Sequence, residues 1–149
     1  MKSTVFADTS SPVKASVALR TFTIRGDERG SLIALEAGLD APFDVKRVYY
    51  IFGTLEGVAR GFHAHRNLKQ VLIAVSGKVR IHCELEGRTE DIWLDSPDKG
   101  LCIEGLVWRE MHDFTPDCVL MVLASEHYDE ADYIRNYEEF KKVCAMESF

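Results

Sequence analysis

Short runs of β-branched, aromatic and aliphatic residues, separated by polar turns roughly every ten residues, constrain the fold of this chain more than any other feature. Several of these turns contain glycine, as in Ser76-Gly77-Lys78, and glycine at such a place ends a strand and reverses the chain. One run, residues 70–75, is almost continuously apolar, as expected of a strand that is buried on both faces. The pattern predicts strands at residues 17–24, 31–36, 46–52, 60–65, 70–75, 79–83, 91–94, 101–103, 106–111 and 118–124.

The end of the chain has a different period. Tyr133, Tyr137, Phe140 and Cys144 recur at helical spacing, so we expect an amphipathic helix over residues 133–146. Many short strands followed by one closing helix indicate an all-β fold, a compact β-barrel or jelly roll with a C-terminal α-helix. We interpret Tyr133, and Trp108 in a strand, as core-packing residues.

Length and composition fit one domain. The chain has 149 residues, of which 46% are hydrophobic, enough for a sizeable core. Residues 1–16 are rich in serine, threonine, alanine and lysine, so we expect a flexible N-terminal tail followed by a single domain over residues 17–149.

Charge and cysteine usage exclude several classes of protein. The formal net charge of −6 argues against a general binder of nucleic acid or membrane surfaces, although a local arginine cluster could still hold a phosphate. No apolar run approaches the length of a membrane span, and residues 1–16 lack the apolar core of a signal peptide. The scattered cysteines are expected to be reduced thiols of a cytoplasmic protein; they are Cys83, Cys102, Cys118 and Cys144.

The segment 60–65 carries the clearest chemical signal. His63 and His65 are one residue apart in a predicted strand, so their side chains lie on the same face. Two imidazoles on one face of a strand indicate either a metal site or acid–base chemistry near neutral pH. At this point both alternatives remain open.

The spacing around the histidines resembles the first signature of the cupin superfamily, Gly-x5-His-x-His-x4-Glu-x6-Gly. Gly57, His63, His65, Gln70 and Gly77 occupy its positions, with glutamine where glutamate is usual.

A third histidine would follow the Gly105 turn in a cupin, and Arg109 stands at roughly that place. Gln70 has a neutral amide in place of the carboxylate, and the Arg109 guanidinium cannot coordinate a metal. Only His63 and His65 remain as ligands, too few for a firmly held metal. The sequence therefore predicts no metal and acid–base work for the histidines.

A longer set of motifs resembles the nucleotide-sugar 3,4-ketoisomerases. The resemblance covers about residues 29–142, nearly the whole predicted domain. The motifs are Arg29-Gly30-Ser31-Leu32, Lys46-Arg47-Val48-Tyr49-Tyr50-Ile51-Phe52, Arg60-Gly61-Phe62-His63-Ala64-His65, Trp108-Arg109-Glu110-Met111, the segment 117–124, Tyr128-Asp129-Glu130 and Tyr133-Ile134-Arg135.

This resemblance implies a cupin jelly-roll domain at residues 17–149 that isomerises a dTDP-4-keto-6-deoxyhexose to the 3-keto sugar without metal or other cofactor. Such enzymes supply an aminotransferase that makes 3-amino-3,6-dideoxy sugars for surface glycans, such as the O-antigen of lipopolysaccharide, or for antibiotics. Members of the family are typically homodimers that exchange an N-terminal strand, and the predicted strand 17–24 is the candidate here.

The residues suit that chemistry. The hydrogen at C3 of a 4-keto sugar is acidic because the carbonyl delocalises the resulting charge, and a histidine can remove it and return a proton. We expect His65 to be the principal base and His63 to assist as acid, shuttle or orienting partner. Tyr49 and Arg109 are candidates to hydrogen-bond the sugar oxygens.

Three further arginines are candidates to bind the substrate. Arg60 and Arg47 are expected to contact the pyrophosphate, because guanidinium groups bind phosphate oxygens bidentately, and for Arg47 a solvated strand-edge cation is an equal alternative. Arg29 follows a glycine turn and is expected to contact the sugar.

Other outcomes remain open at the level of the sequence. Arg109 resembles the gluco-forming branch of the family and Arg29 the galacto-forming branch, and we favour the gluco product. The competing functions are a nucleotide-sugar 3,5-epimerase, a ligand-sensing cupin without turnover, and a metal-dependent cupin oxygenase. The sequence does not distinguish a thymine from a uracil nucleotide.

Overall fold

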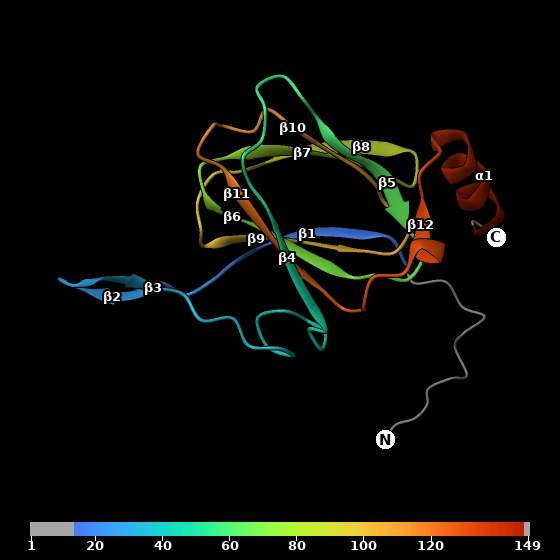
Figure 1. Cartoon of the computed structure of the whole chain (residues 1–149). Coiled ribbons are helices and arrows are strands. Elements are labelled where there is room, and N and C mark those ends of the chain that lie inside the picture. The colour runs from blue at the N-terminus through green and yellow to red at the C-terminus, as the bar shows by residue number, and fades with distance from the viewer. Residues whose placement is uncertain (1–13, 148–149) are drawn as a thin grey trace.

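Two five-stranded antiparallel sheets face each other and enclose the apolar interior (Figure 1). The structure, a computed structural model, describes residues 14–147. The first sheet has the order β1 (Ser16–Thr21), β9 (Lys99–Glu104), β6 (Gln70–Ser76), β11 (Val119–Ala124) and β4 (Arg47–Ile51). The second has the order β12 (Tyr133–Ile134), β5 (Arg60–His65), β10 (Trp108–His112), β7 (Val79–Leu85) and β8 (Arg88–Leu94). The remaining elements are the hairpin β2 (Arg25–Asp27)–β3 (Gly30–Leu32), the 3₁₀ turn η2 (Glu130–Asp132) and the helix α1 (Tyr137–Glu147).

The interior is built by side chains that alternate along the strands. In β7, Val79, Ile81, Cys83 and Leu85 point inward and are fully buried, while the residues between them are partly exposed. Inward-facing residues of the other strands complete the same cluster. The predicted all-β barrel with one C-terminal helix is confirmed, and every predicted strand has a counterpart within a few residues.

A separate covering explains why β6 is buried on both faces. Its alternate residues Val71 and Ile73 face outward and pack in a second apolar cluster with Phe22 and with the partly buried Leu35 and Val45. The segment between β1 and β4 therefore covers the outer face of the first sheet. Beyond this cover, Val75 is exposed.

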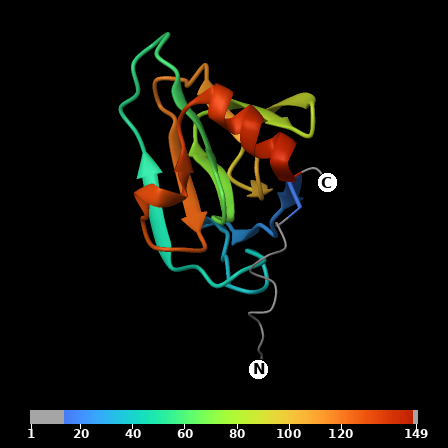
Figure 2. The same cartoon turned by 90° about the vertical axis from the view of Figure 1, so that its right-hand side faces the viewer.

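The helix α1 covers the outer face of the second sheet near β12 and β5 (Figure 2). Phe140 of α1 packs with Ala64 of β5, Trp108 of β10 and Ile134 of β12. Because Ala64 and Trp108 point outward beneath the helix, the residues next to them in each strand point into the barrel.

The predicted start of the helix at Tyr133 is wrong. Tyr133 lies in β12, and α1 begins at Tyr137 because Asn136 caps it: the Asn136 side chain accepts a 2.9 Å hydrogen bond from the Glu139 backbone N–H. Tyr137, Phe140 and Cys144 do belong to the helix, so the apolar period extends one turn beyond the N-terminus of the helix.

The N-terminal strand begins inside the predicted tail. Residues 1–13 of that tail lie outside the described residues, and β1 starts at Ser16 and pairs along its length with β9 of the same chain. The hairpin β2–β3 projects from the barrel (Figure 1). All four cysteines are free thiols, and no described helix is long and apolar enough to cross a membrane.

Candidate active site

Polar side chains from four strands replace the apolar core at one end of the barrel. His63 and His65 come from β5, Arg109 from β10, Gln70 from β6 and Tyr49 from β4. All lie at inward-facing positions of their strands. His65 and Arg109 are each only 1% exposed and Gln70 3%. Buried polar groups are costly unless they are paired, so such a cluster indicates a site rather than a core.

A bulge in β5 sets which residues share the inner face with the histidines. The register of β5 against β10 shifts by one residue: His63 pairs with Arg109, but Gly61 pairs with Glu110 and Arg60 with Met111. Phe62 is the extra residue, with φ 59°, and Gly61 has φ 94°.

Arg60 changes face as a result of the bulge. Since directly opposed residues of an antiparallel pair point to the same side, Arg60 shares a face with the buried Met111 and thus with His63 and His65. Simple alternation from His63 would have placed Arg60 on the opposite face.

The two imidazoles and one tyrosine ring form a compact group. The ring centroids of His63 and His65 are 4.8 Å apart, and the ring of Tyr133 lies 4.4 Å from His65 and 5.1 Å from His63. Tyr133 reaches this place because β12 pairs with β5 and sets Tyr133 directly opposite His65. Tyr133 is therefore part of the site and not the core residue we expected.

Asp132 orients His65. The Nδ1 atom of His65 lies 3.0 Å from Oδ2 of Asp132, while Oδ1 of Asp132 accepts a 2.7 Å hydrogen bond from the Asn67 backbone N–H. Burial alone would raise the pKa of Asp132, but hydrogen bonds from His65 and from the Asn67 and Leu68 backbone lower it below its usual value. An ionised Asp132 accepts the proton on Nδ1, which leaves the lone pair on Nε2.

Burial keeps both histidines neutral. It lowers the pKa of His65 to about 4, although the hydrogen bond to Asp132 opposes the effect. Burial and the charge of Arg109 lower the pKa of His63 to about 3. The Nε2 atom of His65 and the Nδ1 atom of His63 are buried and have no hydrogen-bond partner among the described residues. Near neutral pH, His65 is thus a neutral imidazole whose Nε2 atom is free to accept a proton.

Arg109, Gln70 and Tyr49 form a hydrogen-bonded row. Nη1 of Arg109 donates to Oε1 of Gln70, and Nε2 of Gln70 donates to the hydroxyl of Tyr49 at 3.1 Å. Burial lowers the pKa of Arg109 and raises that of Tyr49. Nη2 of Arg109 is buried without a partner among residues 14–147, so this donor is available to a ligand oxygen.

The donor set does not suit a metal ion. The amide of Gln70 and the guanidinium of Arg109 are bonded to each other at the two positions where a cupin metal site has its carboxylate and third histidine. Among the residues that the structure describes, no group of three or more histidine, cysteine, aspartate or glutamate side chains could hold a metal.

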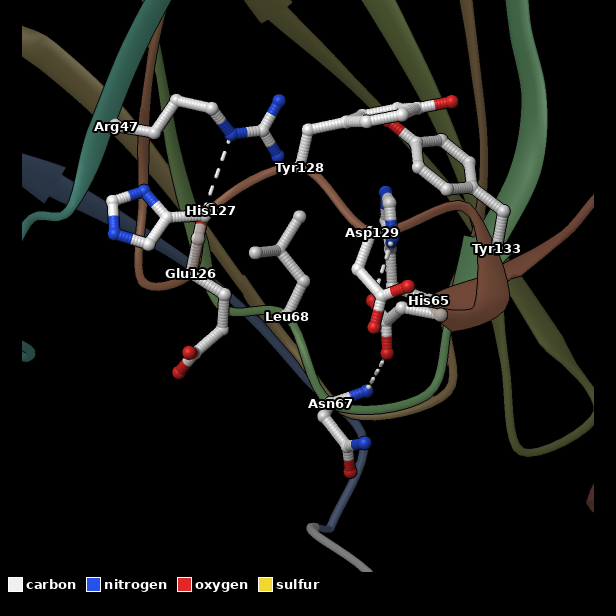
Figure 3. A pocket seen from close by; sticks show the side chains of 10 residues that line it. Arg47, His65, Asn67, Leu68, Glu126, His127, Tyr128, Asp129 and Tyr133 are labelled. Atoms are coloured by element: carbon white, nitrogen blue, oxygen red, sulfur yellow. Dashed lines mark hydrogen bonds and ion pairs between the residues drawn. The ribbon is translucent and has the colours of Figure 1, made fainter.

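An open pocket of about 490 Å³ leads to His65 (Figure 3). Arg47 stands on one side of it in this view and His65 on the other, with Leu68 between them. The Arg47 guanidinium lies 5.3 Å from the ring of Tyr49 and 5.8 Å from that of Tyr128. The pocket is lined by Arg47, His65, Asn67, Leu68, Glu126, His127, Tyr128, Asp129, Asp132 and Tyr133.

The structure brings together five of the seven predicted site residues. They are His63, His65, Tyr49, Arg109 and Arg47. Arg60 is exposed at the far end of β5 and does not line this pocket, although it shares the inner face. Arg29 lies on the β2–β3 turn, paired with Asp27 at 2.6 Å, with 85% of its side chain exposed.

Sequence reasoning missed Asp132 and misassigned Tyr133. Both follow the long loop after β11 and reach the site only because two residues, Tyr133 and Ile134, add a strand beside β5. A signal did exist: Asn136 with Glu139 three residues later is a helix-start pattern, which would have removed Tyr133 from the helix.

The chain is similar to several known proteins. Residues 15–145 match the family described as FdtA, WxcM-like, C-terminal. A TDP-4-oxo-6-deoxy-alpha-D-glucose-3,4-oxoisomerase of Aneurinibacillus thermoaerophilus is 53% identical over 119 residues, which are 80% of this chain and 86% of that protein.

Solved structures give the same picture. QdtA, a sugar 3,4-ketoisomerase from Thermoanaerobacterium thermosaccharolyticum solved with TDP, has a TM-score of 0.86 and 47% identity and covers 89% of this chain and 97% of its own. A histidine-to-asparagine variant of QdtA was solved with TDP-4-keto-6-deoxyglucose. WlaRB, a TDP-quinovose 3,4-ketoisomerase from Campylobacter jejuni, has a TM-score of 0.82 and 48% identity, covering 85% of this chain and 97% of its own.

Proposed function

The chain belongs to the FdtA family of TDP-sugar 3,4-ketoisomerases, and on that premise we propose that it converts dTDP-4-keto-6-deoxy-D-glucose into a dTDP-3-keto-6-deoxyhexose by histidine acid–base catalysis. The observation that carries this proposal is that three buried atoms of the site have no hydrogen-bond partner among the described residues: Nε2 of His65, Nδ1 of His63 and Nη2 of Arg109. A base, a second imidazole and an oxyanion donor are what this isomerisation needs.

The reaction is a shift of hydrogen within the sugar. Nε2 of His65 removes the proton on C3, and the electrons of that C–H bond form the C3–C4 double bond while charge moves to the oxygen on C4. Arg109 and Tyr49 hold this oxygen as the charge develops. A proton then adds to C4, the hydroxyl on C3 loses its proton to become the new carbonyl, and the oxygen on C4 takes up a proton. No atom is gained or lost.

The two histidines divide the proton transfers. His65 is the base because Asp132 fixes its free lone pair on Nε2, and the typical contribution of such a group is about 10²–10⁴ in rate. His63, whose ring lies beside that of His65, serves as shuttle or acid for the return of the proton.

Arg47 is the best supported pyrophosphate contact, because it is the arginine that lines the pocket next to His65. Arg60 would reach the substrate from the other end of β5, on the inner face. Arg29 lies on the β2–β3 hairpin, which projects away from the barrel, so it would contact a substrate only from there. Both remain substrate-binding candidates.

We propose that the protein is a homodimer in which β1 is exchanged between subunits, as in its family. The product is the gluco epimer, which Arg109 favours and which agrees with the quinovose, or 6-deoxyglucose, in the name of WlaRB. The product would enter 3-amino-3,6-dideoxy sugar synthesis for surface glycans in the cytoplasm, where the four free thiols would stay reduced.

The test is incubation of the purified protein with dTDP-4-keto-6-deoxyglucose, with and without a chelator, followed by NMR of the product. We expect isomerisation at the same rate in both samples and an equatorial hydroxyl at C4. Loss of turnover in the chelator would contradict the metal-free mechanism, and an axial hydroxyl would contradict the gluco assignment.

A further inference from the structure

Gln70 lies between Arg109, which can only donate hydrogen bonds, and Tyr49, which can both donate and accept them. It is buried in β6, accepts a hydrogen bond from Arg109 and donates one to the Tyr49 hydroxyl. A guanidinium has no acceptor atom. The amide oxygen of Gln70 must therefore face Arg109, and its NH₂ group must face Tyr49.

This arrangement fixes the direction of the Tyr49 hydroxyl. Because the Tyr49 oxygen accepts the proton of Gln70, its own proton has to point elsewhere. No second hydrogen bond joins this hydroxyl to the part of the chain that the structure describes. Tyr49 lies at an inward-facing position of β4, so the free proton is available to an oxygen of the substrate.

We propose that Gln70 is a positioning residue that makes Tyr49 a hydrogen-bond donor to the oxygen on C4 of the sugar. This inference rests on the proposed function. Gln70 stands where the cupin pattern has a carboxylate metal ligand, and its amide then contributes to catalysis. It orients Arg109 through one end and Tyr49 through the other.

A glutamate at the same place would reverse the second hydrogen bond. A carboxylate accepts only, so one oxygen would still pair with Arg109 while the other accepted the proton of Tyr49. The substrate oxygen would lose this donor. A glutamate would also neutralise the charge of Arg109, and the experiment has to separate these two effects.

The experiment is a double-mutant cycle with Gln70→Glu, Tyr49→Phe and the double variant, assayed beside the wild type with chelator present. We expect each single variant to lower kcat by about 10²-fold, the usual loss for one oxyanion donor. The double variant should be little slower than either single one, because both changes remove the same donor. The affinity for TDP should not change.

Two results would overturn the proposal. If the losses of the single variants multiply in the double variant, Gln70 acts through the charge of Arg109 and not through Tyr49. If Gln70→Glu fails to fold, as judged by thermal unfolding, wild-type kcat in Tyr49→Phe alone would refute the role of Tyr49. A wild-type protein without any turnover would instead contradict the proposed function, so the two failures are distinguishable.

Discussion

Side chains in this site that can only donate or only accept hydrogen bonds determine how their neighbours are oriented. Arg109 has no acceptor and an ionised Asp132 has no proton to give; Arg109 is buried and Asp132 is partly buried, next to the histidines. Each therefore dictates the direction of the hydrogen bond it makes. Nε2 of His65, Nδ1 of His63 and Nη2 of Arg109 then remain without a partner among the described residues and are available to a ligand.

The first prediction concerns Asp132. In Asp132→Asn the new amide can donate to Nδ1 of His65, which would move the imidazole proton to Nε2 and remove the base. We expect kcat to fall at least about 10²-fold, as for other losses of an orienting partner. Asp132→Ala should lower kcat less, because no side chain then forces the His65 proton onto Nε2. Steady-state kinetics of the two variants check this order, and equal activity of Asp132→Asn and wild type would refute it.

The buried histidines also predict how stability depends on pH. In the folded protein the pKa of His65 is about 4, whereas an unfolded chain protonates a histidine near 6.5. Between these values the unfolded state binds more protons, so the free energy of unfolding falls as pH falls from 6.5 toward 4, by up to about 1.4 kcal/mol per pH unit and histidine. Urea unfolding of wild type and His65→Asn across this window checks the sign, since the variant should show a shallower slope.

Strands and turns position these side chains, and most of the strands could be predicted from the sequence. The period-2 pattern predicted the strands. In β4, the exposed Val48 and Tyr50 alternate with the less exposed Arg47 and Tyr49, which share the other face. His63 and His65 share a face as predicted.

The bulge in β5 and the short strand β12 could not be predicted in this way. A bulge shifts the phase without changing the local pattern, and a strand of two residues has no period to detect. These two features explain why the sequence alone did not show that Arg60 shares the inner face, why Asp132 was missed and why Tyr133 was assigned to the core.

The bulge itself can be tested with Gly61→Ala. An added Cβ would lie 3.1 Å from the Arg109 carbonyl oxygen and 3.2 Å from the Cα of Glu110, at a φ of 94° that favours glycine. We expect a loss of about 1–3 kcal/mol in stability together with a lower kcat, because His63 and Arg109 are paired at this point.

Gly87→Ala is the matched control for that variant. Gly87 also has a positive φ, 78°, but lies in the β7–β8 turn with no atom within 4 Å of an added Cβ. It should lose stability and keep the wild-type kcat. If Gly61→Ala behaves like this control, the bulge does not position the site.

At the scale of the whole molecule, β1 can pair within its own chain or, in the dimer that we propose, with the other subunit. Within one chain β1 pairs with β9, and Ala18 lies directly opposite Cys102. Opposed Cβ atoms in an antiparallel pair are about 4.5–5.5 Å apart, close enough for a disulfide after a small adjustment. A cysteine substituted at Ala18 can therefore show, by the disulfide it forms, whether β1 pairs with β9 of its own chain or of the other subunit.

Ala18→Cys should form a disulfide with Cys102 under mild oxidation. If β1 is exchanged between subunits, as we propose, the product is a covalent dimer on a denaturing gel without reductant. A monomer with an internal disulfide would contradict exchange. Ala18→Cys combined with Cys102→Ala is the control and should give neither product.

The central claim is that His65 removes the proton from C3. It is tested most directly by NMR of deuterium incorporation at C3 of dTDP-4-keto-6-deoxyglucose in D₂O, for wild type, His65→Asn and His63→Asn. The account predicts rapid exchange in the wild type, almost none in His65→Asn, and exchange that persists in His63→Asn while isomerisation slows. Near wild-type exchange in both variants, or its loss in His63→Asn alone, would contradict it.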